Sequence, residues 1–325
     1  MSFWDTEPAK PQFVFEDEKK KLIDNMDYLM QMSVEEQTLY KKWVELQEDS
    51  MLRDKSTIAS YYDWQWRPTD INNKELTIKE IEELEPYVEI VEDKNEATKW
   101  THLRRMIHTM SWTANPGRNV KLFIKDKKSG KLLGMVSLAS DVTSMGVRDK
   151  YIGLTKYDKF KKGKLNFTTI ASTIVCTQPL GYNFLGGKLT AMMTTAPIIR
   201  DYWKKKYGQT LIAVGTTSLY GIHSQYNGIP HFKTLGESAG KIAIKPDDEF
   251  YDPWHQWLKE NREDWYKEHI TEERKRNGEN MYGADSQRQG PVSGIKQKIL
   301  GRIFKECGVR AADYHHGFKR GVYLA

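Results

Sequence analysis

The chain has 325 residues, a net charge of +6 at pH 7 and a hydrophobic fraction of 39%. This length allows one or two domains, and the apolar share is ample for a packed core. Cys176 and Cys307 form no CxxC pair and no zinc spacing, which excludes a disulfide framework and favours a reducing, cytoplasmic setting. No apolar run approaches the roughly 20 residues that cross a bilayer, and the polar start lacks the pattern of a signal peptide. We therefore expect a globular protein without a membrane partner.

The first third of the chain, residues 1–98, is predicted to be a helical extension. Residues 16–46 carry an imperfect apolar face at helical spacing, and Thr77 is the predicted N-cap of a helix over residues 77–84. The aromatic cluster at residues 61–66 either stacks on nucleic-acid bases or packs inside the protein, and packing is the commoner use. His102 and His108 lie in a predicted helix at residues 99–110 without a partner pattern, so we expect structural roles for both.

The middle of the chain, residues 99–245, has the pattern of an α+β domain with an α/β-like core. Two strands at residues 120–124 and 132–138 flank a polar turn and predict an antiparallel hairpin. Strands at residues 170–177 and 211–214 are short and apolar without alternation, as buried strands are. The helix between them, residues 189–207, makes them parallel neighbours. Pro197 predicts a kink or a break in that helix.

A glycine-bearing loop leads from the first of these buried strands into the helix. Gly181, Gly186 and Gly187 let the backbone turn sharply, and free amides at a helix start can hold an anion. Ligands of open α/β sheets collect where strands end. We therefore expect residues 178–188 and 216–226 to meet there and to form a site for a phosphate-bearing ligand.

This order of hairpin, strand, glycine loop, helix and strand resembles the GNAT acyltransferase fold, whose glycine loop holds the pyrophosphate of an acyl-CoA. Gln178 and Gly181 match the loop pattern of that family, whereas Asn183 stands where a small residue is usual. The segments that carry a closer resemblance are residues 148–153, 178–188, 216–221 and 232–241. They are similar to the Druantia A anti-phage proteins and to phage Mom-type DNA-modification proteins, both regarded as distant GNAT relatives.

The resemblance covers roughly residues 121–241 and implies a GNAT-like central mixed sheet with helical additions at both ends. It also implies acyl-CoA as a cofactor and transfer of an acyl-type group to an amine of a DNA base. The cofactor-binding residues implied in this way are Gln178, Gly181, Leu185, Gly186, Gly187 and Lys188.

GNAT enzymes often protonate the leaving thiolate with a tyrosine or a serine that follows the second strand. Tyr226 is the best positional match here, with Ser218 behind it, and Asp149 or His223 could accept the proton of the base amine. Two other interpretations stay open. Asp149 pairs with Arg148 or caps a turn, and Tyr226 is a packed aromatic residue.

Basic segments favour nucleic acid as the partner. Residues 156–164 interleave Tyr157 and Phe160 with five lysines, a mixture that can contact phosphates and stack on an unpaired base. Further basic runs lie at residues 204–206 and 296–320. Lysine runs are also common as plain solvated surface. The residues predicted to contact DNA are Lys159, Lys161, Lys162, Lys164, Lys319 and Arg320.

The last part of the chain, residues 246–325, is predicted to be a helical appendage with a terminal arm. Three tryptophans lie among charges in residues 246–277, a polar loop follows at 277–290, and a basic amphipathic helix spans 292–304. His315 and His316 are adjacent on a predicted strand and face opposite sides, so no metal site is expected.

Three classes of function remain open on these grounds. The first is a GNAT-like transferase that modifies DNA. The second is a catalytically silent GNAT-like DNA-binding module whose glycine loop grips backbone phosphate, and Asn183 favours this class. The third is a structural or virion-associated interaction protein that uses the helical additions as contact surfaces.

Overall fold

The computed structural model describes residues 12–48, 54–113, 115, 117–178, 180–184, 186–219, 221–278 and 294–325. The chain divides into two compact units, each described here by itself. The described part of the larger unit lies within residues 35–240, 277–278 and 318–325, and that of the smaller unit within 12–34, 241–276 and 294–317. No helix in these ranges is long and apolar enough to cross a membrane.

The smaller unit is a group of helices with one short sheet. Its elements are α1 (Phe15–Gln31), α11 (Asp248–Asn261), α12 (Glu263–Tyr266), the π-helical turn η4 (Lys267–Thr271), α13 (Glu272–Gly278), α14 (Ile295–Cys307), η5 (Ala311–Asp313), β7 (Lys241–Ala243) and β8 (His315–Gly317). Met26, Trp254, Ile270 and Ile303 are fully buried in its core. The tryptophan-rich stretch is therefore helical, as predicted, and Trp254 is buried in the core of this unit. Beyond residue 278, the predicted loop at 277–290 lies outside the described residues.

The larger unit is built on a seven-stranded mixed sheet with the order β1-β2-β3-β4-β5-β9-β6. Its strands are β1 (Pro86–Ile90), β2 (Asn119–Asp126), β3 (Leu132–Ser140), β4 (Thr168–Cys176), β5 (Ala213–Ser218), β6 (Lys233–Glu237) and β9 (Gly321–Leu324). Strands β2 and β3 form the predicted antiparallel hairpin. Strands β4 and β5 are parallel, as predicted, and every other neighbouring pair in this sheet is antiparallel. The fold is thus a mixed α/β architecture, and its likeness to the GNAT fold stays a prediction.

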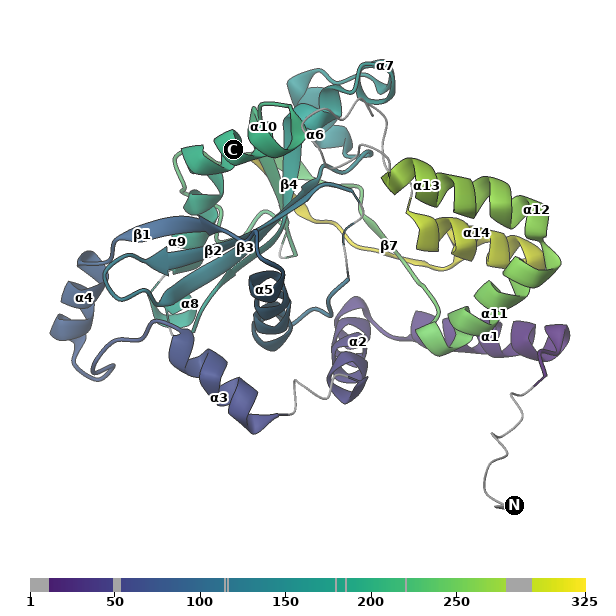
Figure 1. Ribbon diagram of the computed structural model, residues 1–325, viewed down its shortest axis with the longest axis horizontal. Coiled ribbons are helices and arrows are strands. Elements are labelled where there is room, and N and C mark those ends of the chain that lie inside the picture. Colours follow the sequence, from purple (N-terminus) through teal and green to yellow (C-terminus); the bar gives the residue numbers. More distant parts are fainter. Residues whose placement is uncertain are drawn as a thin grey trace. The chain divides into compact units, whose positions relative to one another are not determined.

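Helices of the larger unit precede the sheet and connect its strands (Figure 1). They are α2 (Val34–Glu48), α3 (Lys55–Trp64), α4 (Lys74–Glu82), α5 (Lys94–Ile107), α6 (Gly146–Ile152), α7 (Lys156–Phe160), η2 (Lys164–Phe167), α8 (Leu180–Asn183), α9 (Gly186–Met192), η3 (Met193–Thr195) and α10 (Pro197–Tyr207). The predicted break at Pro197 is confirmed, because Ala196 leaves helical geometry and Pro197 becomes the first residue of α10. A proline is favoured there since the first helical N–H has no partner in the helix.

Two details of the N-terminal helices differ from expectation. Residues 16–46 form two helices, α1 and α2, separated at Met32 and Ser33. The N-cap of α4 is Asn73, whose side chain accepts a hydrogen bond from the backbone N–H of Leu76. The prediction that Thr77 is the cap was wrong. Because the Asn73 cap starts the helix earlier, Thr77 lies inside it, where its hydroxyl donates to the carbonyl of Asp70.

The two tryptophans of the aromatic cluster at residues 61–66 pack inside the larger unit. The ring of Trp64 meets Phe123 of β2 edge to face at 5.0 Å between centroids, and Trp66 is buried. The ammonium groups of Lys99 and Lys125 lie 3.6 and 5.0 Å from the centroid of the Trp64 ring. These contacts support the packing interpretation of the cluster and leave Trp64 poorly placed to stack on a base.

Candidate nucleic-acid interface

Parallel pairing of β4 and β5 brings two lysine runs to one end of the sheet. Thr168 pairs with Ala213 at the start of each strand, so the segments that lead into the two strands must lie together. The backbone N–H of Ile212 donates to the carbonyl of Phe167 at 2.9 Å and joins the two segments directly. Figure 1 shows α6, α7 and α10 at this end.

Seven exposed lysines belong to these segments, and we call their surface the lysine face. They are Lys150, Lys156, Lys161, Lys162, Lys164, Lys204 and Lys205. Lys162 and Lys164 lie 4.0 and 2.8 Å from the Asp158 carboxylate. In the part of the chain that the structure describes, none of the other five has a carboxylate within 4 Å. The lysine face therefore carries a local excess of positive charge.

Local sequence signals fix the course of α6 and α7. Gly153 ends α6 with a left-handed φ of 70°, which glycine adopts without strain. Thr155 then starts α7 with a capping box, in which its hydroxyl accepts from the N–H of Asp158 while that carboxylate accepts from the N–H of Thr155. Hydrogen bonds from Lys164 and Thr155 lower the pKa of Asp158. This residue thus stays charged and holds the turn in place.

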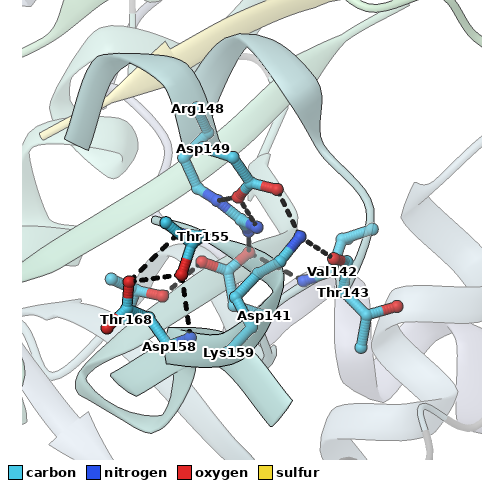
Figure 2. A network of polar contacts seen from close by, with 9 residues as sticks. All are labelled: Asp141, Val142, Thr143, Arg148, Asp149, Thr155, Asp158, Lys159 and Thr168. Carbon is cyan, nitrogen blue, oxygen red and sulfur yellow. Dashed lines mark hydrogen bonds and ion pairs between the residues drawn. The ribbon is translucent and has the colours of Figure 1, made fainter. Parts of the chain in front are cut away.

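A buried ionic network joins α6 and α7, the helices that carry most of the lysine face (Figure 2). Arg148 of α6, only 1% exposed, donates to Asp141 and, at 2.6 Å, to Asp149. Asp141 follows the end of β3 and also accepts from the hydroxyl of Thr168 at 2.5 Å. The network therefore links α6 to the end of β3 and to the start of β4.

Lys159 of α7 completes the network from the other side. Its ammonium lies 2.5 Å from the Asp149 carboxylate and 2.7 Å from the carbonyl of Thr143. The side chain is 10% exposed, so the structure turns Lys159 away from the lysine face, unlike the other three lysines of the predicted DNA contact at residues 161–164. Two carboxylates and two cations balance their charge, which is the condition under which ionic groups tolerate burial.

The contacts of Asp149 match the interpretation in which it pairs with Arg148. One carboxylate oxygen accepts from Arg148 and the other from Lys159. Burial by itself would raise the pKa of Asp149, but the hydrogen bonds from Lys159 and Arg148 outweigh it and hold the pKa below its ordinary value. A carboxylate so stabilised is a poor proton acceptor, and its part in a proton transfer stays a prediction.

Asp141 was missed by sequence reasoning. Burial raises its pKa, which the charge of Arg148 offsets only in part, so the residue depends on this partner. The sequence does contain a signal for the pairing of Asp141 with Arg148. The signal is an aspartate directly after a mostly apolar strand, with an arginine seven positions later, because charged residues are almost never fully buried unless paired.

Lys319 and Arg320 lie away from the lysine face. They precede β9, whose Gly321 pairs with Ser218 at the far end of β5, whereas Leu324 pairs with Gly215 nearer its start. Lys319 is exposed and lies 3.8 Å from the carboxylate of Glu237. Arg320 is half-buried, and burial lowers its pKa. The six predicted DNA contacts therefore do not form one surface.

The glycine loop packs closely against the end of β4. A Cβ on Gly186 would lie 2.7 Å from Leu180 Cγ and still closer to Cys176 Sγ, and a Cβ on Gly181 would lie 2.9 Å from Cys176 Cβ. Gly186 is buried, and burial raises the pKa of the Cys176 thiol to about 12, as expected for a packing group. These glycines permit close packing of helix on strand. Leu185 lies outside the described residues.

The two loops expected to form the site do meet. A Cβ on Gly187 would collide with the side-chain amide of Gln225, and the ammonium of Lys188 donates to the carbonyl of Asn227. Gln178 is exposed at the start of the loop, and His223 is exposed in the turn. The turn after β5 therefore covers the glycine loop.

Aromatic side chains fill the space where β4 and β5 diverge. The last paired residues are Ile170 and Gly215, after which β4 runs on to Cys176 while β5 continues beside β9. Tyr226 is 7% exposed, stacks on Phe232 with 5.8 Å between centroids and packs on Tyr323 at 5.1 Å. Ala191 and Ile229 complete this apolar cluster, and Ser218 is buried at the end of β5.

An acyl-CoA pyrophosphate needs open backbone amides beside the glycines. Here Gly186 faces Cys176 and Gly187 faces Gln225, and α9 has only seven residues. On the Cβ side of Gly186 and Gly187 the described residues leave no room for that group, and acyl-CoA as a cofactor stays a prediction. Among described residues there is also no group of three or more His, Cys, Asp or Glu side chains that could hold a metal ion.

The sheet topology defines a mixed α/β protein. Between β3 and β4 it carries two short helices, α6 and α7, which the buried ion pairs hold together and which bear most of the lysine face. A family model described as "Druantia protein DruA" matches residues 39–325, and the chain belongs to this family. The Druantia protein DruA of Escherichia coli (strain UMEA 4076-1) is 28% identical over 141 residues, which cover 38% of this chain and 34% of that relative. The matched part thus spans about a third of the relative's length. No solved structure matches the chain.

Proposed function

We propose that this chain is a DNA-binding protein of anti-phage defence and that the lysine face contacts the DNA backbone. The observation that carries the proposal is the convergence of two separate lysine runs, residues 156–164 and 204–206, at the start of β4 and β5. Membership of the Druantia DruA family and the resemblance to anti-phage proteins favour the defence context.

Backbone binding by lysines follows from electrostatics. Each lysine that neutralises a phosphate releases a condensed counterion, which makes the affinity high at low salt and steeply salt-dependent. Five lysines of the lysine face have no carboxylate within 4 Å among described residues, so no internal ion pair has to break first. The ionic network of Arg148, Asp149 and Lys159 holds α6 and α7 in place, which lowers the entropy lost on binding.

The core is proposed to be a GNAT-like sheet that serves as a binding module. The antiparallel hairpin of β2 and β3 and the parallel pairing of β4 and β5 support the GNAT-like part, because both belong to the element order that resembles that fold. Close packing of the glycines against Cys176 and Gln225 favours a module over a transferase, because it leaves little room beside them for a cofactor. Transfer of an acyl-type group to a base amine is the second candidate, and the meeting of the glycine loop with the turn after β5 is the observation in its favour.

Salt-dependent DNA binding tests the proposal. Fluorescence anisotropy of a labelled duplex should give a slope of log affinity against log salt that drops by about one unit for each lost phosphate contact. Lys161→Ala and Lys205→Ala should each cause such a drop, whereas Lys319→Ala, an exposed lysine at the other end of β5, should not. Equal effects of all three variants, or no binding, would contradict the proposal.

Mass spectrometry of DNA from cells that express the chain separates the two candidates. A new nucleoside that disappears in a Tyr226→Phe variant, with the protein still folded, would support the transferase. Unmodified DNA together with salt-dependent binding would support the module.

A further inference from the structure

Exposed aromatic rings are concentrated in the segment between β3 and β4 that carries most of the lysine face. Six aromatic side chains are exposed in the described part of the chain, and three of them lie within residues 151–167. Tyr151 of α6 is 50% exposed, Tyr157 of α7 is 61% exposed and Phe167 of η2 is 38% exposed. Single exposed apolar groups need no explanation, but three rings on one short basic segment point to a binding role.

The direction of the Tyr157 ring is set by the ionic network. Residues two apart in a helix point to nearly opposite sides, and residues four apart share a face. Because Lys159 points inward to Asp149, Tyr157 and Lys161 must both point outward from α7. The Tyr157 ring and the Lys161 ammonium therefore both lie on the outer side of α7, whose orientation the ionic network fixes.

Lysines accompany two of these rings closely. The ammonium of Lys162 lies 5.4 Å from the centroid of the Tyr157 ring, and that of Lys233 lies 4.7 Å from the centroid of the Tyr151 ring. A cation near a ring can contact a phosphate while the ring stacks on the base of the same strand. Phosphate contact and base stacking are therefore available side by side.

We propose that the lysine face binds single-stranded DNA, with Tyr157 stacking on an unpaired base. This inference rests on the proposed function. In a duplex both faces of each base are covered by its neighbours, so an exposed tyrosine gains nothing from stacking there. In a single strand the bases are free, and every base offers a π-face regardless of sequence.

Affinities for a labelled oligothymidine and for a duplex of the same length test the inference. Tyr157→Ala should weaken binding of the single strand about tenfold, which corresponds to ~1.4 kcal/mol, and should leave its salt slope and the duplex affinity unchanged. Tyr157→Phe keeps the ring and should bind like the unmodified protein.

A matched control is Tyr62→Ala. Tyr62 is 54% exposed on α3, and α3 lies at the start of β3, where Lys131 donates to the carbonyl of Asp63, whereas the lysine face follows the end of β3. This variant should leave both affinities unchanged. Thermal unfolding of each variant establishes that it is folded.

The outcomes separate the two proposals. Equal binding of single strand and duplex, with Tyr157→Ala affecting neither, would overturn the inference and leave DNA binding intact. A folded protein that binds neither DNA would overturn the proposed function and this inference with it. Loss of affinity in Tyr62→Ala equal to that in Tyr157→Ala would also overturn the assignment of the ring.

Discussion

Lys159 of α7 donates to Asp149 of α6 at 2.5 Å, and this contact joins two short, separate helices. The same carboxylate accepts from Arg148, so one aspartate neutralises cations from both helices. Helices of seven and five residues are too short to be stable alone. The conformation of the lysine face therefore depends on this contact.

Replacing Asp149 with asparagine should destabilise the protein. Asp149→Asn leaves Lys159 and Arg148 buried with one charged partner fewer, and breaking a buried pair in this way costs about 3 kcal/mol. The free energy of unfolding in urea, followed by tryptophan fluorescence, measures the loss. Asp201→Asn is the control, since Asp201 is 73% exposed and its contact with Arg200 is 3.8 Å long. A surface pair of this kind contributes less than about 1 kcal/mol.

Combining Asp149→Asn with Lys159→Met tests whether the lost stability comes from the interaction between these two side chains. The double variant should lose less stability than the sum of the two single variants, because the second change removes the charge that the first left unpaired. Strict additivity would mean that Asp149 and Lys159 do not interact in solution.

Gly186→Ala tests the packing role of the glycine loop. The new methyl group would lie 2.7 Å from Leu180 Cγ and would collide with Cys176 Sγ, and forcing a methyl group into a packed core costs about 2 kcal/mol. Adding Cys176→Ala should return part of the lost stability, since it removes the sulfur. Gly146→Ala is the matched control, because no atom lies within 4 Å of its Cβ position. Unchanged stability in Gly186→Ala, measured by urea unfolding, would instead indicate an open loop.

Local sequence patterns predicted the central strands and helices but not β1, β6 or the place of β9 in the sheet. The hairpin and the break at Pro197 were predictable because each rests on residues close in sequence, and the parallel pair because a single helical connection joins its two strands. Strand β9 was not placed in the sheet, since its four residues pair with residues of β5 and β6, far away in the chain. No local pattern specifies such a pairing.

The parts of the candidate site that follow from local patterns and strand direction were predictable, and the parts that depend on distant residues were not. The meeting of the two loops followed from strand direction alone. The filling of the space between the strands by Tyr226 and Tyr323 depends on β9, which local patterns did not place. Likewise, the lysines of residues 156–164 could be found from composition. That Lys159 alone turns inward depends on Asp149 across the α6–α7 turn.

His108 should make the stability of the larger unit depend on pH. Burial, followed by the charges of Arg104 and Lys42, lowers the pKa of His108 to about 4. The backbone N–H of Met110 donates to its Nδ1 at 3.0 Å, so that nitrogen must be unprotonated. Protonation would break this hydrogen bond and place a third positive charge beside Arg104 and Lys42.

Proton linkage sets the direction of this pH dependence. Because the folded-state pKa lies below the ordinary value of about 6.5, the unfolded chain binds the proton more tightly. The contribution of His108 is complete above about pH 6.5 and is lost as the pH falls toward 4, with a slope of up to about 1.4 kcal/mol per pH unit. The difference in unfolding free energy between the unmodified protein and His108→Asn should shrink over that range. His223→Asn changes an exposed histidine and should show a constant difference. A difference for His108→Asn that stays equally constant would mean that His108 titrates alike in both states.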